Sequence, residues 1–348
     1  MHVGVLTGGG DCPGLNAVIR AVTLALIHDI GAEVTGIERG YMGLLDGRLR
    51  RLSAADVQGI VAQGGTILGT HNKCDPFRWQ GSDCSDQALA TLQRQGIDAL
   101  VVIGGDGTMA IAHRFAQRGV PVVGVPKTID NDLLHTDRSF GFDSAVAVVA
   151  EALGRLETTA RSHGRVMIAE TMGRYAGWIA LEGGLAGAAD VILLPERQCS
   201  VEEVAAACRQ REARGECTLI CISEGVRLRG ELSVMQTLAD SPDPLRLGGV
   251  GAQLAALLQQ QGLTSEIRAT LLGHVQRGGM PTAFDRVLAT RFGWHAARLV
   301  EAGQFGHMVA LQGDAITSVP ISAVAQGSRA VPPGHPLIAA ALSLGVTV

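Results

Sequence analysis

The sequence predicts an α/β fold in which mostly parallel strands form sheets with helices on both faces. Three observations support this prediction. Short apolar runs alternate with helix-like segments in the first half of the chain, and the second half repeats the pattern. The 46 glycines gather at the ends of the apolar runs, where tight loops are needed. The length of 348 residues suffices for two such lobes or for one large one.

Both halves of the chain are predicted to supply strands and helices in alternation. Strands are predicted at residues 2–6, 33–38, 99–103, 120–125, 165–170, 191–195, 218–223 and 269–274. Helices are predicted at residues 16–29, 108–118, 200–214 and 249–261, the third opened by a Ser-x-x-Glu capping box. Residues 227–247 are predicted to form a surface excursion with little regular structure, and the tail after about residue 318 carries no clear pattern.

Composition and charge argue against several classes of protein. The net charge of −4 gives no support for a nucleic-acid or membrane partner, so an anionic substrate would need local basic clusters. No apolar run reaches roughly 18 residues, and no basic segment followed by an apolar core suggests a leader peptide. The seven cysteines include no Cys-x-x-Cys pair, and no His-Glu-x-x-His spacing occurs. We therefore expect a cytoplasmic protein with reduced thiols and no transition-metal cage.

The stretch Pro126–Asp132 follows the strand predicted at residues 120–125 and carries the most chemistry. It combines a lysine, a hydroxyl and two carboxylates, namely Lys127, Thr128, Asp130 and Asp132. A carboxylate can take a proton from an alcohol, a second can manage a cation, and a lysine can hold phosphate oxygens. This set of residues predicts phosphoryl transfer.

The loop Gly104–Thr108 also follows a predicted strand. Asp106 and Gly107 in this loop suit a nucleotide phosphate with its magnesium ion. Asp106 could instead be a plain N-cap of the next helix. We favour ligand binding because the Pro126–Asp132 stretch lies at the next strand end, and the carboxyl ends of parallel strands share one edge of a sheet.

A third glycine-rich loop, Gly8–Gly14, opens the first predicted helix. Backbone N–H groups at Gly9 and Gly10 could cradle a phosphate at the helix N-terminus, although a glycine turn after a first strand is common. The loop is not a dinucleotide-binding Gly-x-Gly-x-x-Gly motif, since Pro13 stands where the third glycine should be. No Gly-x-x-x-x-Gly-Lys-[Ser/Thr] sequence occurs, which disfavours a P-loop NTPase.

The second half carries candidate ligands at the ends of predicted strands. Arg174 could pair with a transferring phosphoryl group or be a solvated surface arginine, and the local residues leave these alternatives even. Glu224 could accept hydrogen bonds from sugar hydroxyls or be a simple strand-end charge. The last predicted strand is bracketed by three groups that fit a phosphate monoester, at Arg268, His274 and Arg277.

Taken together, these motifs resemble those of the 6-phosphofructokinase family. The matching segments occur in family order over about residues 2–310, and they are Gly8–Asp11, Gly64–Thr70, Gly104–Thr108, Pro126–Asp132, Met172–Arg174 and Gly273–Gly279. The resemblance implies the phosphofructokinase fold, with two Rossmann-like, doubly wound lobes. It also implies a phosphoryl-donor domain at residues 1–138 and 279–320, a fructose 6-phosphate domain at 139–278, and a tail at 321–348 that packs on the donor domain.

The resemblance implies roles in the transfer step. Asp130 would take the proton from the sugar 1-hydroxyl, and Thr128 would help to place the sugar and the phosphoryl group. Arg174 and Lys127 would neutralise the transferring group. Asp106 would hold Mg²⁺. The remaining donor contacts are expected at Gly9, Gly10, Lys73, Arg78, Gly105, Gly107 and Thr108.

The resemblance also implies how the sugar phosphate is bound. The fructose contacts are expected at Met172, Gly173 and Glu224, with Asp132 near the reacting end. The 6-phosphate would be clamped by Arg165, Arg268, His274 and Arg277. In the family, two of these arginines reach in from a neighbouring subunit, here Arg165 and Arg268. A homo-oligomer, typically a tetramer, is therefore expected.

The resemblance gives mixed signals about the phosphoryl donor. Family members with aspartate at the position of Gly107 usually use pyrophosphate, so the glycine here favours ATP. Lys127, in contrast, is typical of pyrophosphate users. In the segment 71–78, Lys73 and Arg78 stand where the family usually carries an arginine for the donor. We expect ATP as the donor, with pyrophosphate as the alternative.

Two other classes of function were weighed. An NAD or lipid kinase would share the Gly-Gly-Asp-Gly loop, but it would leave residues 268–279 and 128–132 without a role. A non-catalytic, sugar-phosphate-binding subunit is disfavoured because both Asp130 and Asp106 are present.

Overall fold

The computed structural model describes residues 1–198, 200–237 and 245–348. The chain forms two compact units. Unit 1 comprises Met1–Ile129, Leu133–Ser144 and Arg277–Ser328, and unit 2 comprises Asp130–Asp132, Ala145–Gln276 and Arg329–Val348. Each unit contains a largely parallel sheet with helices, so the predicted α/β class is confirmed.

Unit 1 is built on an eight-stranded sheet in the order β16-β15-β5-β4-β1-β2-β3, with β6 pairing at the end of β5. Its strands are β1 (His2–Thr7), β2 (Glu33–Ile37), β3 (Leu49–Leu52), β4 (Ala99–Gly104), β5 (Val122–Thr128), β6 (Phe140–Gly141), β15 (His307–Gln312) and β16 (Ala315–Pro320). Only β3 and β16, at the two edges, run antiparallel to their neighbours. The central strands β2, β1, β4 and β5 are parallel, as the β-loop-α alternation predicts.

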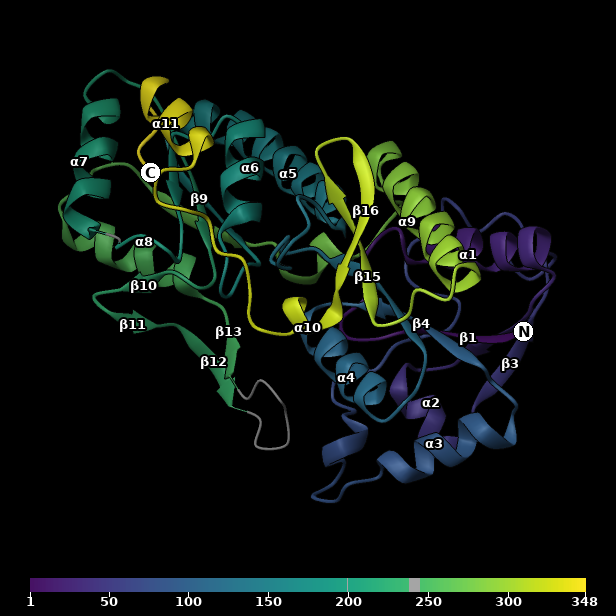
Figure 1. Ribbon diagram of the computed structural model, residues 1–348. Helices are drawn as coiled ribbons and strands as arrows, with labels where there is room; N and C mark the ends of the chain where they lie inside the picture. The colour runs from purple at the N-terminus through teal and green to yellow at the C-terminus, as the bar shows by residue number, and fades with distance from the viewer. Residues whose placement is uncertain (199, 238–244) are drawn as a thin grey trace. The chain divides into compact units, whose positions relative to one another are not determined.

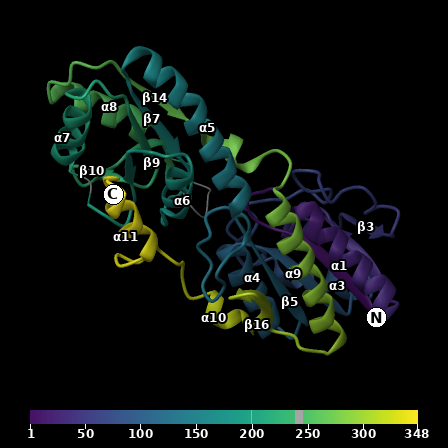
Figure 2. The ribbon, with the colours of Figure 1, turned by 90° about the horizontal axis from the view of Figure 1, so that it is seen from above.

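Helices cover both faces of this sheet. They are α1 (Leu15–Ile30), α2 (Tyr41–Asp46), η1 (Pro76–Arg78), α3 (Ser85–Arg94), α4 (Asp106–Gln117), α9 (Ala283–Glu301) and α10 (Ile321–Val324). Figure 1 shows α1 and α9 on one face and α2, α3 and α4 on the other. The second view shows α1 and α9 side by side, and a Cβ added at Gly293 of α9 would lie 2.7 Å from the Ala21 methyl group (Figure 2).

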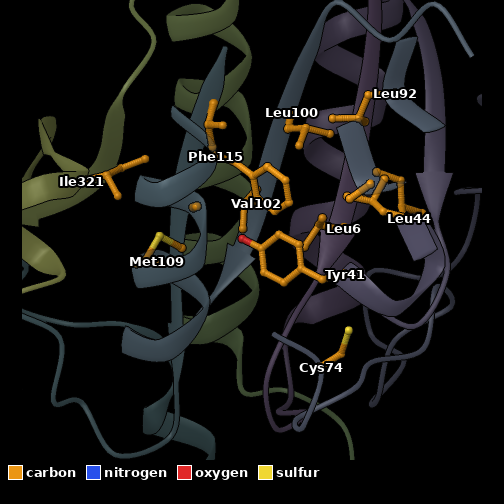
Figure 3. Packing of buried hydrophobic residues seen from close by; sticks show 14 of the residues in the cluster. Leu6, Tyr41, Leu44, Cys74, Leu92, Leu100, Val102, Met109, Phe115 and Ile321 are labelled. Carbon is orange, nitrogen blue, oxygen red and sulfur yellow. The ribbon is translucent and has the colours of Figure 1, made fainter. Parts of the chain in front are cut away.

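The face of α2, α3 and α4 holds one apolar cluster (Figure 3). Leu6, Leu100 and Val102 project from the strands onto Phe115 of α4, which stacks on Tyr41 at a centroid distance of 5.7 Å. All are buried, so this cluster fixes α4 against the sheet and with it the loop that precedes α4.

Unit 2 is built on a parallel four-stranded sheet in the order β14-β7-β9-β8. These strands are β7 (Val166–Thr171), β8 (Val191–Leu193), β9 (Thr218–Ser223) and β14 (Ile267–Leu271). The helices are α5 (Phe142–His163, which enters unit 2 at Ala145), α6 (Trp178–Ala186), α7 (Val201–Glu212), α8 (Val250–Gln260), η2 (Gly273–Arg277, whose last residue belongs to unit 1) and α11 (Pro336–Ser343).

Side chains of the unit 2 sheet alternate between two helical layers, as period-2 strands require. Ile168 and Ile220 pack with residues of α7 and α8. Met167 and Leu219 pack with Ala160 of α5 instead. Both faces are therefore buried, which explains why these strands are continuous apolar runs.

Three segments differ from the sequence prediction. Residues 126–128 were expected in a loop, but β5 continues through Thr128 because β6 pairs alongside it. Residues 227–247 were expected to be irregular, yet β10 (Arg227–Leu228) pairs with β11 (Glu231–Leu232), and β12 (Val234–Thr237) pairs with β13 (Leu245–Leu247). The antiparallel pair β15–β16, which begins before residue 318, was not predicted.

The C-terminal segment also differs from its prediction. Residues 329–348 belong to unit 2, where Thr347 pairs with Val191 and α11 packs on α6, whereas the tail was expected on the donor domain. The six described cysteines are free thiols, and Cys199 lies outside the described residues. Within residues 1–198, 200–237 and 245–348, no helix has both the length and the apolar character needed to cross a membrane.

Candidate active site

The three loops predicted to bind the donor leave one edge of the unit 1 sheet. Strand β4 lies between β1 and β5, with Thr7 opposite Ile103 and Gly104 opposite Pro126. The carboxyl ends of these strands are therefore neighbours, and the Gly8 N–H donates to the Ile103 carbonyl at 2.9 Å. The structure thus brings the glycine loops and Lys127 to one sheet edge.

Thr108 explains why two of the glycines are needed. Its buried side chain sits between the first two loops. A Cβ added at Gly104 would lie 2.4 Å from the Thr108 Cβ, and one added at Gly8 would lie 2.8 Å from the Thr108 Oγ1. Either Cβ would displace Thr108, whose carbonyl accepts a hydrogen bond from the Tyr41 hydroxyl at 2.9 Å. The loops can approach each other this closely only as glycines.

Asp106 and Gly107 lie on the exposed side of the same loop. Gly105 is the N-cap of α4 and Asp106 is its first helical residue, so Asp106 does not occupy the capping position considered above. A Cβ at Gly107 would meet no atom within 4 Å. The N-terminus of α4 therefore carries an exposed carboxylate beside a position with open space.

Two cations converge on the first loop. The buried Lys127 ammonium group donates to the Gly10 carbonyl, and the Arg277 guanidinium donates to the Asp11 carbonyl at 3.2 Å. A Cβ at Gly10 would lie 2.8 Å from the Arg277 Nη1. Arg277, predicted for the sugar phosphate, thus belongs to unit 1 with the donor loops.

The segment after Gly64 borders the same loop. The Thr70 hydroxyl donates to the Gly9 carbonyl at 2.5 Å, a contact that the sequence did not assign to any residue. Lys73 and Arg78 follow within eight residues, and both are exposed. Their side chains are therefore accessible to a ligand.

The proposed base lies in a turn that belongs to unit 2. Asp130–Asp132 form this turn, and Asn131 has a left-handed backbone with φ of 52°. The Arg329 guanidinium donates to the Asn131 carbonyl at 2.9 Å. Sequence reasoning missed Arg329, because it stands 198 residues from its partner and in no motif.

The predicted fructose contacts share the carboxyl edge of the unit 2 sheet. The loop Met172–Arg174 follows β7, Glu224 follows β9, and His274 follows β14. Since β7 lies between β14 and β9, these strand ends are adjacent. The Ser223 hydroxyl donates to the Gly173 carbonyl, and Arg174 donates to the Leu245 carbonyl. This edge presents an acid, an arginine and an imidazole.

The other two predicted phosphate ligands lie elsewhere in unit 2. Arg165 directly precedes β7, and Arg268 is the second residue of β14, so both stand at the amino ends of their strands. Glu266 pairs with both, at 2.5 Å from the Arg165 Nε. Hydrogen bonding by Arg165 lowers the pKa of Glu266 below its ordinary value. The two arginines are therefore not assembled with His274 within one chain.

Glu170 is a buried acid in β7 that no sequence motif singles out. Its carboxylate accepts from the Gly249 and Gly251 N–H groups, both at 2.8 Å, at the start of α8. Burial raises the pKa of Glu170. The carboxylate caps α8 and ties that helix to the strand that leads into Met172–Arg174.

The residues present fit a magnesium ion that arrives with a substrate. Among the described residues, no group of three or more His, Cys, Asp or Glu side chains could hold a metal ion. Mg²⁺ in phosphoryl-transfer sites commonly uses one or two carboxylates and takes its other ligands from phosphates and water. The exposed Asp106 carboxylate at the N-terminus of α4 is suited to that role.

Comparisons with known proteins identify relatives of this chain. A family model described as phosphofructokinase matches residues 2–300. The chain is 47% identical over 356 residues to ATP-dependent 6-phosphofructokinase 2 of Clostridium perfringens, covering 99% of this chain and 97% of that protein. It is 49% identical over 334 residues to the pyrophosphate–fructose 6-phosphate 1-phosphotransferase of Amycolatopsis methanolica, covering 96% and 97%.

A solved structure of similar fold is that of Pichia pastoris phosphofructokinase in the T-state. It has a TM-score of 0.81 and 32% identity, and the match covers 93% of this chain and 35% of that one. The chain thus spans about a third of that larger protein. Given the family model and the relatives matched over nearly their whole length, the chain belongs to the phosphofructokinase family.

Proposed function

We propose that this protein transfers the terminal phosphoryl group of MgATP to the 1-hydroxyl of fructose 6-phosphate, giving fructose 1,6-bisphosphate and ADP, the phosphofructokinase step of glycolysis. Unit 1 binds the donor, and unit 2 supplies most of the contacts to the sugar phosphate. The single observation that carries the choice of donor is the open space at Gly107, at the N-terminus of α4. A nucleotide needs room beyond its terminal phosphates, and a side chain there would take that room.

Asp130 is the proposed general base. It accepts the proton of the 1-hydroxyl as the oxygen attacks the phosphorus, and positioned bases of this kind contribute roughly 10²- to 10⁴-fold. Thr128 helps to place the reacting groups. Lys127 and Arg174 supply positive charge to the phosphoryl oxygens, where charge accumulates in a loose transition state.

The donor is held mainly by backbone. N–H groups at Gly9, Gly10 and Gly105 face the phosphates, and the N-terminus of α4 adds its dipole. Asp106 would hold a magnesium ion that enters with ATP, and the ion would supply positive charge at the phosphate oxygens. Lys73 and Arg78 reach the donor from their exposed segment.

We propose that the sugar site is completed by a second copy of the chain, in a homotetramer. Met172, Gly173, Glu224 and Asp132 contact the sugar, and His274 and Arg277 contact its 6-phosphate. A six-residue strand such as β7 is about 20 Å long, so Arg165 is too far from the carboxyl edge to serve its own chain. Arg165 and Arg268 would serve the neighbouring subunit instead.

Pyrophosphate is the second candidate donor. Relatives of nearly equal identity carry names for the ATP-dependent and the pyrophosphate-dependent reaction. Lys127 beside the first loop would suit a short, highly charged donor. Gly107 favours ATP, because a pyrophosphate enzyme has no need for space beyond the second phosphate.

One assay tests the proposal. The purified protein receives fructose 6-phosphate and Mg²⁺ with either ATP or pyrophosphate, and fructose 1,6-bisphosphate is measured. We expect turnover with ATP. Turnover with pyrophosphate alone would overturn the choice of donor, and turnover with neither would overturn the enzyme assignment. We also propose a cytoplasmic location, where both substrates are found.

A further inference from the structure

We propose that Arg329 is a positioning residue that fixes the Asp130–Asp132 turn and so sets the orientation of the base. The inference rests on the proposed function, because it concerns the same reaction. It assigns a role to the C-terminal segment, which carries no recognisable sequence pattern and yet contacts the turn directly.

Arg329 holds the turn through its side chain and its backbone. Its guanidinium donates two hydrogen bonds to the Asn131 carbonyl, from Nη2 at 2.9 Å and from Nε at 3.3 Å. Its own N–H donates to the Asp132 carbonyl at 2.6 Å. Two consecutive carbonyls of the turn are therefore fixed by one residue of the C-terminal segment.

The conformation of the turn shows what the contact fixes. Asn131 is buried and adopts φ of 52°, a left-handed conformation that asparagine reaches more readily than most residues other than glycine. The three residues of the turn belong to unit 2, while the chain before and after them belongs to unit 1. Rotation about Asn131 would swing the adjacent Asp130, so fixing the Asn131 carbonyl fixes the direction of the base.

Arg329 is itself held in place by a buried tryptophan. The Arg329 guanidinium lies over the Trp178 ring at 4.6 Å from its centroid, and the Trp178 Nε1–H donates to the Arg329 carbonyl at 3.0 Å. Trp178, the first residue of α6, is 3% exposed. His335 packs edge-on against the same ring at 5.0 Å. The planar guanidinium suits both the stack and the forked contact.

The carboxylate of Glu196 holds the residues that follow Arg329. The Glu196 Oε1 accepts from the Val331 N–H at 2.8 Å and from the Gly177 N–H at 2.9 Å. The next helix, α11, packs on α6 (Figure 1). The turn is therefore connected to the rest of unit 2 by α6 and the segment Arg329–Val331. All of these residues lie within one compact unit.

The expected consequence is a loss of kcat with little change in donor binding. The hydrogen bonds of Arg329 to the Asn131 and Asp132 carbonyls hold the turn of the proposed base and not a donor loop, so its removal should leave the KM for ATP within about twofold of wild type. A misplaced base lowers the rate, and a displacement near 1 Å can cost on the order of 10²-fold. We expect Arg329→Ala to lower kcat about 10- to 100-fold, and Arg329→Lys to lower it less, because a lysine keeps one donor but not the fork.

The test compares Arg329→Ala and Arg329→Lys with Arg155→Ala, an exposed arginine of unit 2 whose guanidinium pairs with Glu151 of the same helix. Steady-state kinetics are measured with and without added methylguanidinium. Partial recovery of kcat in Arg329→Ala by methylguanidinium, but not by methylammonium, is expected from a local role. Wild-type kcat in both Arg329 variants would overturn the proposal. If Arg329→Ala does not fold, Arg329→Lys decides the outcome by the same comparison.

Hydrogen exchange separates this inference from the proposed function. Peptides covering residues 126–136 should exchange at least about fivefold faster in Arg329→Ala than in wild type or Arg155→Ala, since the turn loses its anchor. If the wild type forms no fructose 1,6-bisphosphate, the proposed function fails, and exchange still decides whether Arg329 holds the turn. Unchanged exchange in these peptides would overturn the inference even in an active enzyme.

Discussion

The carboxyl edges of the two sheets carry different kinds of residues. In unit 1, the edge consists of glycine loops that close around Thr108, and its two cations bond to loop carbonyls. In unit 2, the corresponding edge presents Arg174, Glu224 and His274, which are charged or can become so. Both edges are formed by the carboxyl ends of parallel strands.

This difference indicates what each edge can recognise. The glycine edge, that of unit 1, holds its loops closer together than side chains at Gly8 and Gly104 would allow, so its selectivity depends on the space left for a ligand. The charged edge offers point charges and a carboxylate, so its selectivity depends on charge and hydrogen bonding. Substitutions in unit 1 should therefore act through volume, and substitutions in unit 2 through charge.

The largest effect is expected at Asp130, in the turn Asp130–Asp132. Asp130→Ser should lower kcat by about 10²- to 10⁴-fold, the usual contribution of a positioned base. Because the turn belongs to unit 2, the KM for the donor should change little. Steady-state kinetics with each substrate varied would check this, with Asp314→Ser, an exposed aspartate of unit 1, as the control. A rise in donor KM with kcat preserved would place Asp130 at the glycine edge instead.

The next largest effect is expected from adding a side chain where the glycine loops of unit 1 pack closely. Gly104→Ala puts a methyl group 2.4 Å from the Thr108 Cβ, and overpacking of this kind costs roughly 1–3 kcal/mol. Displacement of Thr108 should also lower activity, by up to about 100-fold if the loop moves near 1 Å. Thermal unfolding and kcat/KM are the measurements.

Gly107→Ala is the matched control, since a Cβ there meets nothing within 4 Å. It should leave the free energy of unfolding unchanged or raise it by a few tenths of a kcal/mol. Equal losses in the free energy of unfolding from Gly104→Ala and Gly107→Ala would mean that Thr108 does not fill the space between the loops.

The sequence predicted those parts of the site that leave a local pattern. The β-loop-α alternation placed the Gly104 loop and the start of the Pro126–Asp132 stretch at one sheet edge, and the structure agrees, with Gly104 opposite Pro126. The sequence did not reveal that β5 extends through Lys127, because the pairing partner, β6, has only two residues. Glu170 and Arg329 were also missed. Both act on backbone groups, and a backbone N–H or carbonyl carries no side-chain signature in the sequence.

A buried acid of unit 1 is expected to make the free energy of unfolding depend on pH. Asp285 is fully buried, and its Oδ2 accepts from the Ser144 N–H at 2.8 Å. Burial raises the pKa of Asp285 from 3.8 to about 6. As the pH rises from about 4 through about 6, the unfolded chain ionises this carboxyl first, so the folded state loses stability over that range.

Asp285→Asn removes this loss. The free energy of unfolding of the variant relative to wild type should increase between pH 4 and pH 7, by up to about 3 kcal/mol for a shift of two pKa units. Urea unfolding across that pH range measures it. Parallel pH profiles for the two proteins would show that the carboxyl is not the source of the dependence.

The smallest effect is expected from removing one positive charge in unit 2. Arg268→Ala should raise the KM for fructose 6-phosphate about tenfold, the value of one charge-assisted hydrogen bond, and leave the KM for ATP unchanged. The difference from wild type should shrink at high salt, because exposed charges are screened. Arg155→Ala is the control, and a salt-independent effect would argue for packing in place of charge.

The central claim is that empty space at residue 107 lets the glycine edge of unit 1 accept a nucleotide. The most direct measurement is kcat/KM with MgATP and with pyrophosphate for wild type and Gly107→Asp. We expect the wild type to use ATP, and the variant to lose this activity through crowding and like-charge repulsion while remaining folded. Unchanged ATP kinetics in the variant would contradict the claim.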